Sequence, residues 1–197
     1  MDANDEDIST FTFRVISNCS KLNEYTKKNI TVLPQTESIR NKLQQGRRYS
    51  ILDITDYFSS IRCSEEYAKV FGLVMPFGCY KPKTLLQGAV NSPHTGQTIS
   101  NWGLIHTIIE KNGQPLTDAV AMIDDFGHII YPQDSVSEEL RLINYLIKQQ
   151  LENFTNSGGK DKPLKISPYK MKIGVQTVEY LNKIFHKVQT TNDPSNY

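Results

Sequence analysis

One short stretch constrains the fold of this chain more than any other. It reads AVAMIDDFGHIIY over residues 119–131, where two apolar segments flank two adjacent carboxylates. Apolar runs on either side of a turn predict an antiparallel hairpin, with Gly127 supplying the permissive backbone conformation. An ionised carboxylate is costly to bury, and a second one beside it adds repulsion between like charges. Asp124 and Asp125 therefore lie either at a solvated hairpin tip or beside positive charge that offsets them.

Apolar periodicity predicts two further elements before this hairpin. Residues 47–55 form an apolar, β-rich run that ends at Asp53 and predicts a buried strand. Ser92 as N-cap and Pro93 as the first helical residue predict the start of a helix that ends at residues 112–113. Its apolar stripe is predicted to consist of Ile99, Trp102, Ile105 and Ile109.

A second helix is predicted after the hairpin, and short strands follow it. The helix opens around residues 132–135 and carries an amphipathic stripe. The stripe is predicted to consist of Val136, Leu140, Ile143, Ile147, Leu151 and Phe154. Helices interspersed with antiparallel hairpins predict an α+β fold in which helices pack on one face of an antiparallel sheet.

Charge and hydropathy bear on whether the chain is a nucleic-acid-binding, secreted or membrane protein. The 197 residues carry a net charge of only +1, so composition alone does not indicate a nucleic-acid-binding protein. The region from Lys160 onward is more basic and could meet phosphates, or it could be an ordinary solvated surface. The sequence shows no signal peptide and no run of 18 apolar residues, which predicts a cytoplasmic or nuclear protein that does not contact the membrane.

The order of motifs resembles the fingers and palm of reverse transcriptases, especially those of gypsy-like long-terminal-repeat retrotransposons and retroviruses. The resemblance covers about 175 residues, from Phe11 to about Phe185. Five segments carry it: FRVISNCSKLN, YSILDITDYFSSI, LLQGAVNSP (similar to LPQGxxxSP), AMIDDF (similar to YxDD) and KISPYKMKIGVQTVEYLNKIF. Each match alone is modest, whereas five in the same order form a specific pattern.

The resemblance implies a reverse-transcriptase-like palm plus a fingers subdomain, without a thumb or an RNase H domain. The implied division is 1–50 and 66–90 for the fingers, 51–65 and 91–187 for the palm, and 188–197 for a tail. It also implies an RNA-directed DNA polymerase that binds an RNA or DNA template-primer and dNTP. A further subunit, or the rest of a Pol polyprotein, would supply the thumb.

In this family, catalysis requires two hard cations that activate the primer hydroxyl and neutralise the triphosphate. Hard cations prefer oxygen ligands. The resemblance therefore implies that Asp53 and Asp124 hold Mg²⁺ or Mn²⁺ between neighbouring strands, with Asp125 close by in a supporting role. The alternative for Asp53 is a capping or turn residue.

Five more residues match nucleotide-binding positions of the family. Arg14 corresponds to the fingers arginine that grips the triphosphate, and Phe58 to the aromatic residue under the sugar that excludes a 2′-hydroxyl. Gln87 and Gly88 correspond to the loop beside the incoming nucleotide. Lys170 is the candidate for the residue near the pyrophosphate. The alternatives are a core aromatic for Phe58, and either Lys172 or a plain surface lysine for Lys170.

The chain departs from the family pattern at several positions. The replaced residues are Met122 at the Tyr of YxDD, Leu86 at the Pro of LPQG, Tyr57 beside the sugar gate, Asn182 at the Gly of FLG and Ser20 in the fingers. Residues 5–7 are acidic where relatives carry basic side chains. These differences leave a second hypothesis, a domesticated or inactive domain that binds RNA or protein or dimerises. A third hypothesis is an unrelated α+β domain with accidental motifs, which would be favoured if the Asp53 strand did not pair near the Asp124 hairpin.

Overall fold

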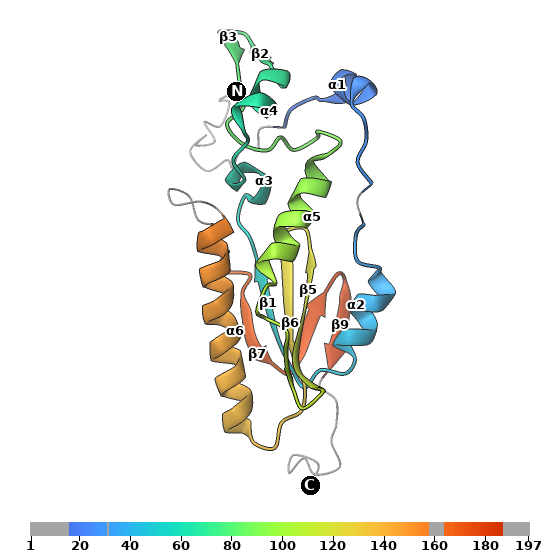
Figure 1. Cartoon of the computed structure of the whole chain (residues 1–197), viewed down its shortest axis with the longest axis vertical. Helices are drawn as coiled ribbons and strands as arrows, with labels where there is room; N and C mark the ends of the chain where they lie inside the picture. The colour runs from blue at the N-terminus through green and yellow to red at the C-terminus, as the bar shows by residue number, and fades with distance from the viewer. Residues whose placement is uncertain (1–15, 31, 158–163, 187–197) are drawn as a thin grey trace, which may run out of the picture.

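A five-stranded antiparallel sheet forms the centre of the protein in a computed structural model that describes residues 16–30, 32–157 and 164–186 (Figure 1). The strand order is β4-β5-β6-β1-β7. The strands are β1 (Arg48–Asp53), β4 (Ile109–Lys111), β5 (Gln114–Met122), β6 (Asp125–Ile130) and β7 (Lys172–Val175). The strand that ends at Asp53 therefore pairs directly with the hairpin that carries the two adjacent aspartates, so the observation that would have favoured the third hypothesis is not made.

Two long helices, α5 (Ser92–Gly103) and α6 (Val136–Ser157), lie side by side on one face of the sheet (Figure 1). The even-numbered residues of β1 and β6 point toward them, as strand alternation requires. Leu52 and Phe126 are fully buried there, and Phe126 meets Phe154 of α6 edge to face at 4.8 Å between ring centroids.

The opposite face is covered as well, which the sequence did not predict. Helix α2 (Thr36–Leu43) and the hairpin of β8 (Thr177–Tyr180) and β9 (Lys183–His186) pack against it. Their buried side chains include Leu43, Val178 and Phe185, which join Tyr49 and Ile129 of the sheet in one apolar cluster. The expectation of helices on one face alone is thus correct for α5 and α6 but misses this second layer.

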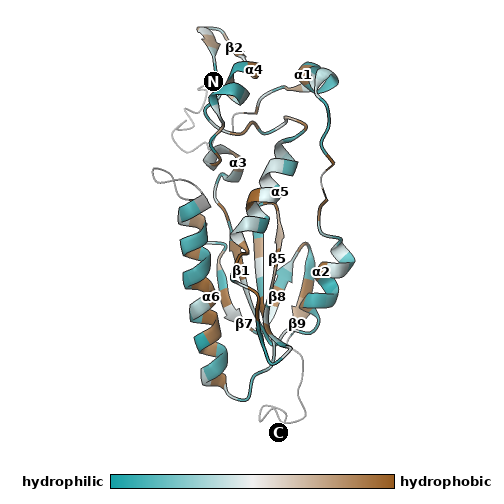
Figure 2. Ribbon diagram, viewed as in Figure 1, coloured by the Kyte–Doolittle hydropathy of each residue, from teal (hydrophilic) through white to brown (hydrophobic). Residues whose placement is uncertain are grey.

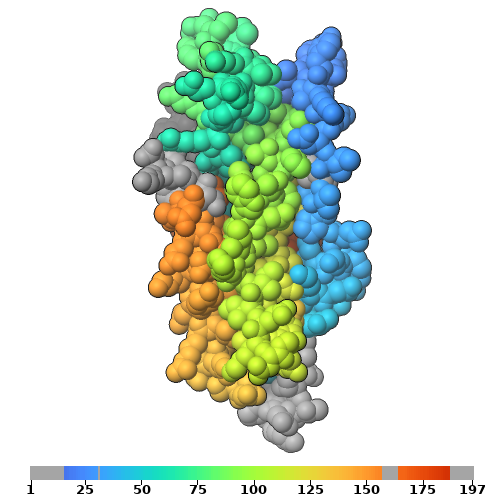
Figure 3. Space-filling model, in the orientation of Figure 1, coloured from blue at the N-terminus to red at the C-terminus, as the bar shows by residue number. Residues whose placement is uncertain are grey.

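Short elements extend the molecule beyond the end of the sheet where β1 finishes, and give it the elongated outline of Figure 3. They are α1 (Ser20–Tyr25), α3 (Tyr57–Ser60), α4 (Glu65–Val70), β2 (Leu73–Met75) and β3 (Gly78–Tyr80). Two asparagines fasten the α1 segment to the loop before α5. Asn23 accepts from the Val90 amide and donates to the Gly88 carbonyl, and Asn91 donates to the Lys27 carbonyl.

Helix α5 is shorter than predicted. It begins at Ser92 with Asn91 as N-cap and ends at Gly103, whereas the sequence predicted Ser92 as the cap and residues 112–113 as the end. Asn112 and Gly113 instead form the two-residue turn between β4 and β5, with φ of 53° and 75°. Both values are positive, as a type I′ hairpin turn requires, so the Asn-Gly pair marks a hairpin and not a helix end.

Helix α6 buries a different stripe from the one predicted. Ser135 caps the helix by accepting from the Glu138 amide. Ile143 and Phe154 are buried as expected, but Val136, Leu140 and Leu151 are about half exposed. The buried face instead includes three residues that were not predicted, the apolar Leu146 and the polar Glu139 and Gln150. Figure 2 shows the resulting mixture of hydrophilic and hydrophobic colour along the helix.

The buried polar residues of α6 are satisfied by partners on other elements. Glu139 is 1% exposed and accepts from Arg48 Nε on β1 at 2.6 Å. Gln150 donates to the Gly103 carbonyl at 2.7 Å, and its oxygen lies 2.9 Å from Nε2 of His128. These contacts fix the position of α6 against both β1 and the end of α5, because a buried polar group without its partner is costly.

His128 is fully buried, and burial lowers its pKa to about 4. The folded state therefore keeps the ring neutral below pH 6.5, where the unfolded chain already binds a proton. We expect its contribution to stability to be complete above pH 6.5 and to be lost as the pH falls to about 4, at up to about 1.4 kcal/mol per pH unit. Urea unfolding of the wild type and of His128→Leu between pH 7 and pH 4 measures this loss. The variant is expected to be less stable at pH 7 but to lose less stability on acidification, and an identical slope in both proteins would contradict the assignment.

Candidate active site

The two aspartates lie at a tight turn between β5 and β6. Met122 pairs with Asp125, which leaves Ile123 and Asp124 as the two turn residues. Ile123 has a φ of 56°, a left-handed conformation that is uncommon for a β-branched residue and costs free energy. The surroundings must therefore hold this turn in place.

Gly127 does not supply the turn conformation, contrary to the prediction. It lies inside β6 opposite Val120, and an added Cβ would come within 3.0 Å of Val120 Cγ2. Close strand packing, and not a special backbone angle, requires glycine there.

Helix α5 grips the turn through a buried glutamine. Gln97 is 2% exposed, and its oxygen accepts from the Ile123 amide at 3.0 Å. Its amide nitrogen donates to the Ala121 carbonyl at 3.0 Å and to Asn101 Oδ1 at 2.9 Å. One side chain thus binds the backbone on two residues of the hairpin, and it loses all of these hydrogen bonds if the turn relaxes.

A serine of α5 and a tyrosine of α3 provide further hydrogen bonds that hold the turn against α5. Ser100 donates to the Ile123 carbonyl, and the Tyr57 hydroxyl lies 2.6 Å from Ser100 Oγ and 2.7 Å from the Gly96 carbonyl. Tyr57 donates its single proton to the Gly96 carbonyl, and the single hydroxyl proton of Ser100 serves the Ile123 carbonyl at the turn. Desolvation raises the pKa of Tyr57 to about 12, so this hydroxyl keeps its proton at neutral pH.

The third carboxylate meets this turn across the sheet. Asp53, at the end of β1, is the register partner of Asp125, and the Ile54 amide donates to the Asp124 carbonyl at 3.2 Å. Residues directly opposite in an antiparallel pair point to the same face. Burial raises the pKa of Asp125 first, and the negative charges of Asp124 and Asp53 raise it further.

Lys170 offsets part of this negative charge. Its Nζ lies 3.1 Å from Asp53 Oδ1, and its proximity lowers the pKa of Asp125 in opposition to the other effects. The Ser167 amide donates to the Asp53 carbonyl at 2.8 Å, which fixes the segment that carries the lysine. Lys172, the alternative candidate, lies in β7 opposite Ile51 and further from the end of β1.

Asp53 and Asp124 carry carboxylate oxygens, the type of ligand that magnesium prefers. Across residues 16–30, 32–157 and 164–186, no three His, Cys, Asp or Glu side chains gather into a complete metal-binding group. Magnesium, however, commonly uses one or two carboxylates and completes its shell with water and substrate phosphates. Asp53 and Asp124 are suitable carboxylates, and the Lys170 ammonium now paired with Asp53 would have to move aside.

The predicted nucleotide-binding residues fall into two groups. Phe58 lies near the turn, because it packs edge to face on Tyr57 at 5.7 Å and both rings adjoin Gly96 of α5. It is half-buried and packs against the apolar cluster under α5, and its place beneath a sugar stays a prediction. Gln87 and Gly88 are exposed in the loop before α5, where Gly88 has a φ of 106° and an added Cβ would meet the Ser17 carbonyl at 2.9 Å.

Arg14 lies outside the described residues, so its predicted contact with a triphosphate stays a prediction.

Sequence reasoning missed the residues that position the acids. Tyr180 of β8 donates to the Asp125 carbonyl at 3.0 Å. Gln97 and Ser100 belong to a buried face of α5 made of small and polar residues, which are Ser92, Gly96, Gln97, Ser100 and Gly103. Their helical spacing was a usable signal, but the more hydrophobic Ile99 and Trp102 suggested another face.

Comparison with known proteins bears on the fold. No protein-family model and no curated protein sequence matches the chain. Solved structures of retroviral enzymes do match. A prototype foamy virus protease-reverse transcriptase superposes with a TM-score of 0.63 at 16% identity, over 90% of this chain and 22% of that one.

Two complexes give similar results. A foamy viral protease-reverse transcriptase with double-stranded DNA matches with a TM-score of 0.62 at 17% identity, over 85% of this chain and 26% of that one. A foamy viral protease-reverse transcriptase with an RNA/DNA hybrid matches with a TM-score of 0.58 at 16% identity, over 83% of this chain and 20% of that one. The chain therefore has a reverse-transcriptase-like fold and spans about a quarter of these proteins. The described residues contain no helix long and apolar enough to cross a membrane.

Removing the buried glutamine tests the grip of α5 on the turn. Gln97→Ala leaves the Ile123 amide without its acceptor, and we expect a loss of about 1–3 kcal/mol in the free energy of unfolding. Thr98→Ala is the matched control, since Thr98 is exposed on the same helix and is expected to cost under about 0.5 kcal/mol. Chemical denaturation measures both variants, and equal losses would show that Gln97 does not hold the turn.

Asp125→Asn tests the cost of ionising Asp125, which comes first from burial and then from the negative charges of Asp124 and Asp53. Because the pKa of Asp125 is raised in the folded state, its ionisation opposes folding at neutral pH, and this penalty disappears below the ordinary pKa of about 4. We therefore expect the variant to be more stable than the wild type at pH 7, with a difference that shrinks toward pH 3. Thermal unfolding across this range measures the difference. A variant that is less stable at pH 7 and equal at pH 3 would have the opposite sign and would contradict the raised pKa of Asp125.

Proposed function

We propose that this chain is the core of an RNA-directed DNA polymerase, derived from a retrotransposon Pol. The observation that carries the proposal is the meeting of Asp53 with the Asp124–Asp125 turn at one end of a sheet with a reverse-transcriptase-like fold. Burial and the nearby charges of Asp124 and Asp53 oppose the ionisation of Asp125, and a ligand that uses this negative charge would account for its position.

The proposed reaction joins a dNTP to a primer. The primer 3′ oxygen attacks the α-phosphorus, a new phosphodiester forms, and pyrophosphate leaves. Asp53 and Asp124 would hold magnesium or manganese, which would supply activation of the primer hydroxyl and neutralisation of phosphate charge. Asp125 would support the ions.

Residues around the carboxylates would orient the nucleotide. The exposed edge of Phe58 would lie beneath the sugar and exclude a 2′-hydroxyl, and Gln87 and Gly88 would line the nucleotide site from the loop before α5. Lys170 would leave Asp53 and neutralise the departing pyrophosphate. Arg14 would grip the triphosphate through a bidentate guanidinium.

The partners follow from the same proposal. An RNA or DNA template-primer would lie across the end of the sheet, as suits a fold shared with proteins whose structures hold double-stranded DNA or an RNA/DNA hybrid. A further subunit, or other parts of a Pol polyprotein, would supply the thumb that grips the duplex.

One observation favours the second candidate, a domain that binds RNA or protein without catalysis. The Lys170–Asp53 ion pair occupies a carboxylate oxygen that a metal ion would need. A domain that no longer binds metal would keep this ion pair permanently. In an active enzyme, the substrate and the metal would displace the lysine from the aspartate.

Primer extension separates the two candidates. The full chain is incubated with dNTPs and a DNA primer on an RNA template, in Mg²⁺ or Mn²⁺, beside Asp124→Asn. We expect extension by the wild type and at least a 10- to 100-fold loss in the variant, since even outer partners of metal ligands contribute that much. Asp134→Asn, an exposed acid before α6, is the matched control and should extend normally.

A protein that binds the template-primer but extends it with neither metal would exclude the polymerase and leave the binding domain. Equal extension by the wild type and Asp124→Asn would instead show that Asp124 does not hold the metal. Thermal unfolding with and without Mg²⁺ provides an independent measurement, because metal bound to the folded state raises the unfolding temperature.

A further inference from the structure

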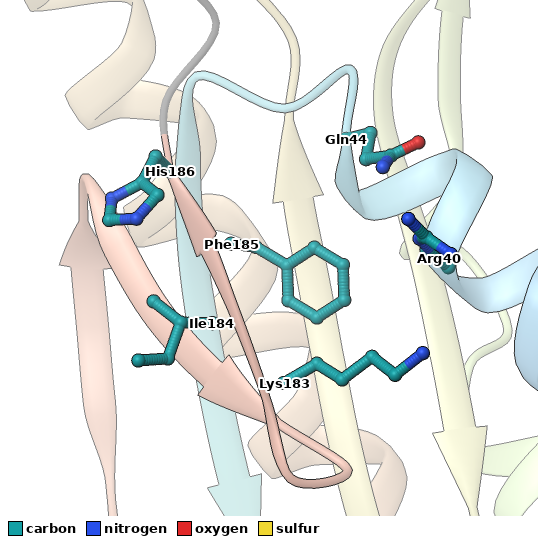
Figure 4. Close-up of a pocket in the computed structure, with 6 residues that line it drawn as sticks. All are labelled: Arg40, Gln44, Lys183, Ile184, Phe185 and His186. Atoms are coloured by element: carbon teal, nitrogen blue, oxygen red, sulfur yellow. The ribbon is translucent and has the colours of Figure 1, made fainter.

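An open cavity lies between helix α2 and strand β9, away from the carboxylates. Its volume is about 450 Å³, and it is lined by Arg40, Gln44, Lys183, Ile184, Phe185 and His186 (Figure 4). The motifs that resemble reverse transcriptases assign no role to this cavity.

Strand alternation divides the β9 residues between two sides. Lys183 and Phe185 point toward α2, whereas Ile184 and His186 point the other way (Figure 4). From α2, Arg40 and Gln44 lie one helical turn apart and face them. The nearly buried Phe185 ring forms an apolar floor, and the polar ends of three longer side chains surround it.

The polar ends favour a negative ligand. Arg40 and Lys183 supply two positive charges, and the Gln44 amide supplies a neutral donor. Glu37 lies 3.7 Å from Arg40 as an exposed ion pair, which contributes little and leaves most guanidinium donors available. A guanidinium and an ammonium together suit a phosphate group, which accepts several charge-assisted hydrogen bonds.

The cavity and the carboxylates are joined by one hairpin. Lys183 is the register partner of Tyr180, whose hydroxyl donates to the Asp125 carbonyl. Leu181 and Asn182 close the hairpin with φ of 48° and 60°, so the connection is short. A strand of nucleic acid bound at the carboxylates would therefore reach the α2–β9 cavity by following this hairpin.

We propose that the α2–β9 cavity binds a backbone phosphate of the nucleic acid, an inference that rests on the proposed function for its choice of ligand. Arg40 and Lys183 hold the phosphate oxygens, Gln44 adds a donor, and Phe185 excludes water from the floor. The site anchors the duplex independently of sequence, because phosphate contacts carry no base information.

Binding without catalysis tests the proposal. Fluorescence anisotropy measures the affinity of the full chain for a labelled RNA/DNA hybrid in EDTA, where no extension can occur. We expect Arg40→Gln combined with Lys183→Gln to weaken binding about 10-fold and to reduce the slope of log K against log salt by about 2, one unit for each lost contact. Arg141→Gln combined with Lys148→Gln removes the same charge from the exposed face of α6 and is the matched control.

Equal losses of affinity for the hybrid in both double variants would overturn the proposed phosphate site, since such losses would reflect the change in net charge alone. The single variant Lys183→Gln guards against misfolding, because this side chain is exposed and its removal leaves Phe185 in place. Titration with inorganic phosphate separates the ligand source. A phosphate response that depends on Arg40 and Lys183, with hybrid binding unchanged, would overturn the nucleic-acid assignment. Failure of primer extension alone leaves the anisotropy result intact, so the two proposals fail separately.

Discussion

The hold of α5 on the turn between β5 and β6 is the interaction on which the rest of the candidate site depends. Ile123 occupies a left-handed conformation that an isolated hairpin would leave, because a β-branched side chain is strained there. Gln97 and Ser100 satisfy both the amide and the carbonyl of this residue from a buried position. The free energy of these hydrogen bonds offsets the strain, and the direction of Asp124 follows from it.

The same turn brings Asp125 of β6 opposite Asp53 of β1. Asp53 and Asp125 are opposed across two strands, and only Lys170 is seen to form an ion pair with either of them among the described residues. A neutral pair at this register would relieve the repulsion that raises the pKa of Asp125. The fold thus keeps a local electrostatic cost beside a rigid support, the combination typical of sites whose charge is used by a ligand.

Sequence patterns predicted the central hairpin and the strand before it because their apolar runs are long and their turns are polar. They failed at α5 for a physical reason. Its buried face consists of glycines, serines and a glutamine, so hydrophobicity points to the wrong side, and Trp102 remains 62% exposed. The end of α5 was misplaced because Asn112 and Gly113 suit both a helix end and a hairpin, and only pairing with β5 decides between them.

The arrangement of the candidate site depends on strand register, which the order of residues in the sequence does not specify. Asp53 and Asp125 are 72 residues apart, and no local pattern specifies that they face each other; the ladder between β1 and β6 does. The choice between Lys170 and Lys172 is similar. The Ser167 amide binds the Asp53 carbonyl, so the chain passes the end of β1 before it enters β7, and Lys170 reaches the carboxylate while Lys172 is drawn along the strand. A shift of two residues in that pairing would exchange the positions of the two lysines. The backbone contact at Ser167 therefore determines which lysine offsets the negative charge of the acids, and the identity of either side chain does not.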